Sequence, residues 1–138
     1  MIYLLDTNVC IRYLNGRSPA VRERLHALHP RDIVVCAVVK AELFFGAERS
    51  HDPARTLTVQ QRFLAPYRSL PFDDRAAEIA ARVRARLAQQ GTPIGSYDLQ
   101  IAAIALANDC ILVTHNVREF GRVSGLQIDD WEATSNGQ

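Results

Sequence analysis

Short runs of apolar residues alternate along the chain with longer segments whose apolar residues recur at helical spacing. The first run, Tyr3 to Asp6, indicates a buried strand that ends in a carboxylate. From Thr7 onwards, apolar side chains follow at i+3, i+4 and i+7, the spacing of one helix face. Residues 33–36 and 111–114 have the pattern of further buried strands. This alternation predicts parallel βαβ units, with helices on both faces of one sheet.

Capping and turn residues delimit the other elements. Helices are expected over Thr7–Asn15, Pro19–Leu28, Val38–Arg49, Pro53–Leu64, 74–90 and Tyr97–Asp109, the last with Ser96 as its N-cap. Weaker strands are expected over Arg68–Phe72, an edge strand because it contains a proline, and over Leu126–Ile128, with a loop over Asn116–Gly125. The predicted fold is a three-layer α/β/α sandwich around a mainly parallel sheet of four or five strands. It forms one domain over residues 1–132, with a disordered tail at 133–138.

The composition is that of an ordinary soluble domain, with 48% hydrophobic and 22% charged residues. No apolar run approaches the ~20 residues needed to span a bilayer, and the N-terminus lacks the basic region of a signal peptide. We therefore expect a cytoplasmic protein without membrane contact. Cys10, Cys36 and Cys110 are widely spaced among apolar residues, so they are expected to be buried reduced thiols.

The net charge of +1 gives no global basic field that would attract a nucleic acid. Of the 16 basic residues, however, only Lys40 is not an arginine. Arginine makes bidentate contacts with phosphate that lysine cannot make, although codon bias in a GC-rich genome accounts for the ratio more simply. Any contact with nucleic acid must therefore come from a local patch.

Polar side chains stand where strands end or where the following helices begin. Asp6 ends the first strand, Glu42 lies early in the helix after the second, and Asp98 lies in the first turn of an apolar helix. Asn116 comes two residues after the strand that follows that helix. In a parallel βαβ sheet all these positions share the carboxyl edge, where ligands bind. We therefore expect the four side chains to face one crevice.

Carboxylates brought together in this way repel each other, and a divalent cation relieves the repulsion. Mg²⁺ and Mn²⁺ prefer oxygen ligands, and such a site can activate water and hold a phosphodiester for attack. The histidines His26, His29, His51 and His115 are scattered and lack zinc spacing. Simpler roles remain open for single residues. Asp6 could be only an N-cap, and Asp98 could only complement a helix dipole, whereas Glu42 sits among apolar residues, where a carboxylate must be paired or functional.

Four short motifs resemble those of the PIN domain and, more narrowly, of VapC-type toxins from type II toxin–antitoxin pairs. They are Leu5-Asp6-Thr7-Asn8, Ala41-Glu42-Leu43 before Gly46-Ala47, Tyr97-Asp98 before Ile101-Ala102, and Leu112-Val113-Thr114-His115-Asn116 with Arg118-Glu119-Phe120. The resemblance runs from Ile2 to Trp131. It implies a Mg²⁺- or Mn²⁺-dependent endoribonuclease that cuts structured RNA, often tRNA and here initiator tRNA. It also implies a homodimer, a VapB-like antitoxin as partner, and operator DNA bound only through that antitoxin.

Carried over residue by residue, the resemblance assigns Asp6, Glu42 and Asp98 to the acidic metal site. Many members carry an aspartate where this chain has Asn116, which removes one negative charge and weakens the case for a second metal ion. Glu119 could supply the missing carboxylate. Thr7 and Thr114 are expected to orient carboxylates through their hydroxyl groups, with capping or strand packing as equal alternatives.

Basic side chains are expected to rim an acidic pocket that takes RNA. The candidates are Arg12, Lys40, Arg118 and Arg122, each of which could equally be an ordinary surface charge. Apolar side chains on two neighbouring helices exceed what a small core needs and could take the antitoxin or a second protomer, or could simply be core. They are Phe44, Phe45, Leu57, Val59 and Phe63.

Two other functions fit parts of the pattern. A phosphatase with an aspartate nucleophile also begins with a strand ending in Asp, but it usually has a second Asp where this chain has Asn8. A catalytically weak PIN fold that only binds RNA or a partner is favoured by Asn116 alone. A dinucleotide-binding domain is disfavoured because no G-x-G-x-x-G follows the first strand.

Overall fold

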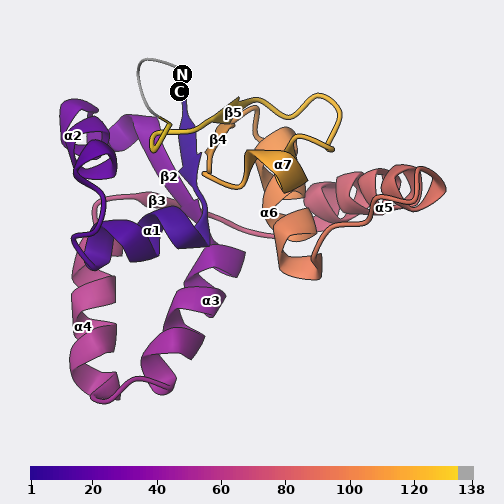
Figure 1. Cartoon of the computed structure of the whole chain (residues 1–138). Helices are drawn as coiled ribbons and strands as arrows, with labels where there is room; N and C mark the ends of the chain where they lie inside the picture. The colour runs from indigo at the N-terminus through magenta and orange to yellow at the C-terminus, as the bar shows by residue number, and fades with distance from the viewer. Residues whose placement is uncertain (134–138) are drawn as a thin grey trace.

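A computed structural model describes residues 1–133 and shows five parallel strands in one sheet, with helices packed around it (Figure 1). The strand order is β3-β2-β1-β4-β5. The strands are β1 (Tyr3–Leu5), β2 (Ile33–Cys36), β3 (Arg68–Leu70), β4 (Ile111–Val113) and β5 (Ile128–Asp129). The predicted α/β sandwich is therefore confirmed, and the sheet is entirely parallel rather than mainly so.

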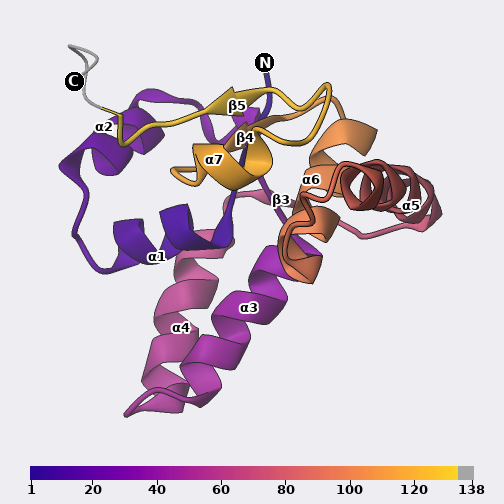
Figure 2. The ribbon, with the colours of Figure 1, turned by 45° about the vertical axis from the view of Figure 1, so that its right-hand side comes forward.

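The helices of the described chain fall into groups around the sheet. They are α1 (Thr7–Leu14), α2 (Pro19–Ala27), the 3₁₀ turn η1 (Pro30–Asp32), α3 (Ala37–Glu48), α4 (Pro53–Leu64), α5 (Asp74–Gln89), α6 (Ser96–Ala107) and α7 (Val117–Phe120). Helices α3 and α4 run side by side away from the sheet, and α5 packs against α6 at a steep angle to it (Figures 1 and 2). No helix within residues 1–133 is long and apolar enough to cross a membrane.

Register aligns the carboxyl ends of the central strands. Leu5 pairs with Val113, and Val113 pairs with Asp129. The ladder continues one residue further, because the Asp6 amide donates to the Val113 carbonyl at 3.1 Å and the Thr114 amide donates to the Asp129 carbonyl at 3.2 Å. The residues that follow β1, β4 and β5 therefore leave the sheet at the same edge.

The core lies between the sheet and its helices. Helix α6 is apolar nearly all round, and its residues Leu99 and 101–105 are buried, which confirms the prediction of a buried helix. The three cysteines are free and buried, as expected. Burial raises the pKa of the Cys10 thiol well above its usual value, so this thiol stays protonated.

Some local predictions were wrong. The segment predicted as a loop contains the short helix α7, because the Asn116 side chain accepts from the Glu119 amide and caps a single turn. Ser96 is not an N-cap, because Gly95 takes that position without a side-chain bond. The last strand lies at Ile128–Asp129 rather than Leu126–Ile128. The edge strand β3 is confirmed, although it ends at Leu70, before the proline. From residue 134 on, the predicted disordered tail lies outside the described residues.

Candidate functional site

Asp6 is fixed at the end of β1 by hydrogen bonds on its own carboxylate. Its side chain is buried, with the residue only 5% exposed, and its Oδ1 accepts from the Val9 amide at 2.8 Å as the N-cap of α1. The Thr114 hydroxyl donates to the same carboxylate. Burial outweighs these bonds and raises the pKa of Asp6 to about 6, with further contributions from the negative charges of Glu132 and Glu42. Asp6 is therefore both a helix cap and a buried acid close to other carboxylates.

Glu42 is held toward Asp6 by the residue that follows Asp6. The Thr7 hydroxyl, in the first turn of α1, donates to Glu42 Oε1 in α3 at 2.6 Å, linking positions 35 residues apart. A hydrogen bond to a carboxylate is charge-assisted and strong. The expected orienting role of Thr7 is thus visible as a contact, and it brings the start of α3 to the carboxyl edge.

Asp98 and Glu119 form a second acidic group at this edge. Both reach the backbone at Gly95, where a side chain on that glycine would meet Glu119 Oε1 at 3.7 Å and Asp98 Oδ2 at 3.8 Å. The Gly95 amide donates to Glu119 Oε1 at 2.9 Å and keeps the pKa of Glu119 below its usual value. Desolvation, followed by the neighbouring Glu119 charge, raises the pKa of Asp98 to about 7. The two carboxylates therefore share one small space.

Asn116 connects the two acidic groups through hydrogen bonds. Its side-chain nitrogen donates to Glu119 Oε2 at 3.0 Å, and its backbone amide donates to Thr114 Oγ1 at 3.0 Å. Thr114, which is fully buried, then donates to Asp6. The amide at this position thus orients the Glu119 carboxylate, and Glu119 is the group that places a charge beside Asp98.

Sequence reasoning missed Glu132, which reaches the same edge from the segment after β5. Its side chain is 8% exposed and pairs with Arg12 Nε through Oε1. Its charge contributes to the raised pKa of Asp6. The rule that selected Asp6 did not extend to Glu132, because Glu132 lies three residues after the two-residue strand Ile128–Asp129.

The donor set of this edge fits a hard divalent cation. All candidate ligands are oxygens. Burial, with a smaller contribution from neighbouring carboxylate charges, raises the pKa of Asp6 and Asp98, and a bound cation would offset this cost. Within residues 1–133, no three His, Cys, Asp or Glu side chains are close enough together to enclose a metal ion. The arrangement therefore suits an ion held by one or two carboxylates, with water and phosphate oxygens completing its shell, as is usual for Mg²⁺.

The predicted basic rim is spread around this edge. Arg12 is engaged by Glu132, and Arg122 donates to the Pro93 carbonyl at 3.0 Å, which steadies the loop before α6. Arg118 is exposed on α7, and Lys40 is half-buried on α3. Contact of these four side chains with RNA stays a prediction.

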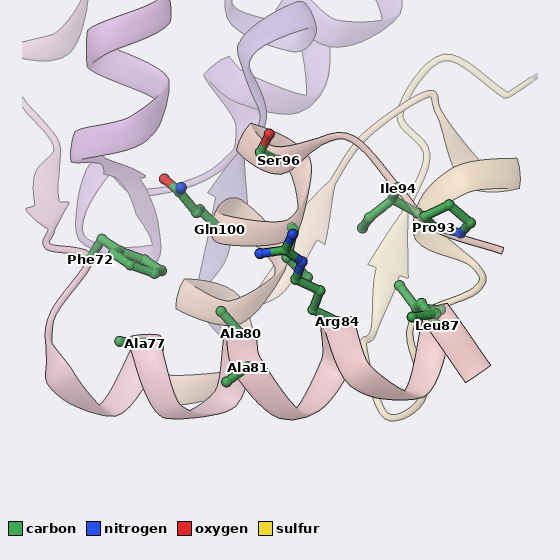
Figure 3. A pocket seen from close by; sticks show the side chains of 12 residues that line it. Phe72, Ala77, Ala80, Ala81, Arg84, Leu87, Pro93, Ile94, Ser96 and Gln100 are labelled. Atoms are coloured by element: carbon green, nitrogen blue, oxygen red, sulfur yellow. The ribbon is translucent and has the colours of Figure 1, made fainter. Parts of the chain in front are cut away.

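Two grooves differ in their relation to the acids. One, of about 640 Å³, runs between α5 and α6 and is lined by Ala77, Ala80, Leu87 and other residues, none of which is acidic (Figure 3). It is therefore not the acidic site. The other, of about 400 Å³, lies between α1, α3 and α4 and borders Glu42.

The apolar residues expected on α3 and α4 divide between core and surface. Phe44 and Phe63 pack against the core. Phe45 is 62% exposed and Val59 is 46% exposed, and Val59 lines the groove beside Glu42. Leu57 is half-buried. The five residues are therefore neither all core residues nor all available to a partner.

Comparison with known proteins places these observations in a family context. The PIN domain family model matches residues 3–126. The chain is 40% identical to the tRNA(fMet)-specific endonuclease VapC of Shigella flexneri, over 94% of this chain and 97% of that protein. It is similar to the DNA-bound VapBC structure from Salmonella typhimurium, with a TM-score of 0.89, 37% identity, and coverage of 95% of this chain and 98% of that one. Rickettsia felis VapBC2, bound to a promoter DNA fragment, gives a TM-score of 0.88 with 31% identity, over 95% and 99% of the two chains.

Proposed function

Because the chain belongs to the PIN domain family and to its VapC-type members, we propose that it is the toxin of a VapBC-type pair, an endoribonuclease that uses Mg²⁺ or Mn²⁺. One observation carries the proposal. Carboxylates from four separate segments, Asp6, Glu42, Asp98 and Glu119, reach one sheet edge, and burial and proximity raise the pKa of two of them. Such a cluster costs free energy unless it binds a cation.

Asp6 and Asp98 would hold the cation, with Glu42 and Glu119 beside them. A bound divalent cation supplies the Lewis-acid chemistry of phosphodiester hydrolysis. The chain's own part is positional. Val9 and Thr114 fix Asp6, Thr7 fixes Glu42, and Gly95 with Asn116 fixes Glu119. Exposed Arg118 and half-buried Lys40 would meet RNA phosphates at the rim.

The proposed substrate is tRNA, and initiator tRNA in particular. Support comes from the relative in Shigella flexneri, whose name specifies tRNA(fMet) and which is 40% identical over nearly the full length of both proteins. The reaction would take place in the cytoplasm, where tRNA is found.

Cleavage of purified RNA tests the site and the substrate together. The chain should cut initiator tRNA in the presence of Mg²⁺, and mapping of the new RNA ends should give one dominant position. Asp6→Asn and Asp98→Asn should abolish the cut. Wild-type activity in both variants would refute the site assignment, whereas cleavage of other RNAs alone would refute only the substrate.

The antitoxin would be a small VapB-like protein that covers the groove between α1, α3 and α4. This groove is bordered by exposed apolar side chains, Ile11 and Val59, with Phe45 nearby on α3. Glu42 also lines it, so a partner there would sit directly beside the acids. Operator DNA would be bound only through this partner. Val59→Asp should abolish co-purification with the neighbouring gene product, while Val117→Asp, an exposed apolar position on α7, should not.

A homodimer is also proposed, through the groove between α5 and α6. Its lining is mainly apolar and combines alanines such as Ala80 and Ala81 with larger side chains such as Phe72 and Leu87, a surface that a second copy could cover (Figure 3). Sedimentation should give a dimer mass for the wild type and a monomer mass for Ala81→Glu. A wild-type monomer at all concentrations would refute the homodimer.

A further inference from the structure

Every salt-bridge contact within residues 1–133 involves an acid from the end of β5 or from the residues just after it. Residues 129–132, here named the C-terminal clasp, pair with three earlier positions: Asp129 with Arg24, Asp130 with His115, and Glu132 with Arg12. Trp131, buried between them, packs on Tyr3 and under the Arg24 guanidinium. The clasp therefore fixes the chain against α1 and α2 at the carboxyl edge.

Glu132 differs from the other acids of the clasp because one of its buried carboxylate oxygens has no hydrogen-bond partner. The carboxylates of Asp129 and Asp130 have several hydrogen-bond partners each. Glu132 Oε1 is paired with Arg12, but Oε2 is buried and has no hydrogen-bond partner. A buried carboxylate oxygen without a donor is rare in folded proteins, and its usual explanation is a water molecule or an ion.

Topology brings this oxygen to the acidic site. Thr114 connects the clasp with the acidic site. Its backbone amide donates to the Asp129 carbonyl, and its hydroxyl is hydrogen-bonded to Asp6. Arg12, which holds Glu132, lies on the helix that Asp6 caps. The Glu132 charge also lies close enough to help raise the pKa of Asp6, after the larger effect of burial.

We propose that Glu132 is a further positioning carboxylate of the acidic edge: its Oε2 holds a water of the divalent cation bound at Asp6, while its Oε1 pairs with the competing charge of Arg12. The inference rests on the proposed metal-dependent function. It gives Arg12 the role of neutralising Glu132 in the metal-free protein, where the two side chains form a salt bridge, instead of contacting RNA. A water-mediated contact fits the absence, within residues 1–133, of any three acids close enough to enclose a metal directly.

Glu132 could form a purely structural salt bridge or position a cation, and the two roles predict different effects of mutation. If the pair only stabilises the fold, removing either partner has the same consequence. If Glu132 serves the cation, removing its charge weakens metal binding, whereas removing the competing positive charge of Arg12 strengthens it. The sign of the change therefore separates the two roles.

The experiment is a Mn²⁺ titration of the full-length chain at a pH well above the pKa of Asp6. Binding is measured by calorimetry and by the electron paramagnetic resonance signal of free Mn²⁺. Glu132→Gln should weaken Mn²⁺ binding about 10-fold, the size of effect seen when groups that orient metal ligands are removed. Arg12→Met should tighten binding. Asp129→Asn is the matched control: it loosens the same clasp but keeps the Glu132 charge, and its affinity should equal that of the wild type.

Several results would overturn the proposal. Wild-type affinity in Glu132→Gln would do so, as would equal weakening in Asp129→Asn, which would trace the effect to the clasp as a whole. Weakening in Arg12→Met would also contradict it, and this variant decides the question even if Glu132→Gln fails to fold. Absence of Mn²⁺ binding by the wild type would overturn the proposed function as well, whereas binding that requires Asp98 but not Glu132 would overturn the Glu132 inference alone.

Discussion

The acidic edge has two halves that are built differently. Around Asp6, the carboxylate is buried and receives hydrogen bonds from Val9 and Thr114, so its position is set by the fold itself. Around Asp98, two carboxylates share a space beside Gly95, and α7, which carries Glu119, is a single turn. The carboxylate of Asp6 is therefore held in place by the fold, whereas Asp98 and Glu119 repel each other. A cation should therefore matter most to the second half, where the donors Gly95 and Asn116 serve Glu119 and leave Asp98 beside its negative charge.

The largest expected effect is on catalysis, and it should be the same in both halves. Asp6→Asn and Asp98→Asn should each lower the rate of tRNA cleavage by about 100-fold or more, the scale of losing one electrostatic group in an active site. Single-turnover cleavage assays would measure this. An unequal result, with one variant fully active, would mean that only one half contains the site. Asp130→Asn, in an acid outside both halves, is the control.

Removing the aspartate of each half should have very different effects on the free energy of unfolding. Asp6→Ala removes the N-cap of α1 and leaves the buried Thr114 hydroxyl without its acceptor, so the free energy of unfolding should fall by about 2–3 kcal/mol. Asp98→Ala relieves repulsion and should leave the stability of the metal-free protein unchanged or higher. Urea unfolding measures both. A loss as large in Asp98→Ala as in Asp6→Ala would erase the distinction.

Metal affinity should depend on Glu119. Glu119→Gln removes the charge beside Asp98 but keeps the shape of the side chain, and it should weaken Mn²⁺ binding about 10-fold. The same change should lower the pKa of Asp98, measurable by NMR titration of its carboxyl carbon. Glu78→Gln, on the distant helix α5, is the matched control. An unchanged affinity would show that Asn116, and not Glu119, completes the site.

The pH dependence of stability follows from the same two acids. Their pKa values rise from 3.8 to about 6 for Asp6 and to about 7 for Asp98, so the folded, metal-free protein binds more protons than the unfolded chain across this range. Stability should therefore decrease as the pH rises from about 4 to about 7. Saturating Mg²⁺ should weaken or reverse this trend, because it binds the ionised carboxylates. Thermal melting with and without Mg²⁺ is the measurement, and a rise in metal-free stability over this range would contradict it.

The smallest effect is expected at Thr7. Thr7→Val breaks the 2.6 Å bond to Glu42 and should cost about 1 kcal/mol, seen as a few-fold loss of cleavage rate with little change in folding. Thr7→Ser retains the hydroxyl and should behave as the wild type. If the two variants are equally impaired, the methyl group rather than the hydrogen bond matters at this position.

The sequence alone predicted most of the fold and the fixed half of the site. Strand–helix alternation and the abrupt end of β1 at Asp6 were sufficient, because hydrophobic period and the rules of βαβ connection determine both. The same connection rule placed Glu42 and Asp98 at the edge where Asp6 lies.

Helix α7 and the position of Glu132 could not be predicted from local sequence patterns. Helix α7 is a single turn whose stability comes from Asn116 and from the bond between Glu119 and Gly95, and contacts across 24 residues leave no periodicity. Glu132 lies after a strand of two residues, too short to be located by alternation. Its burial depends on Arg12, 120 positions earlier, which sequence spacing does not reveal.

Crystals grown with Mn²⁺ would test most directly whether both halves serve one cation. An anomalous difference map should show a Mn²⁺ ion at the carboxyl edge, coordinated by oxygens of Asp6 and Asp98, with Glu132 in contact through water. A map with no ion at that edge at saturating Mn²⁺, or with the ion bound away from Asp6 and Asp98, would contradict the metal site on which the proposed ribonuclease activity depends.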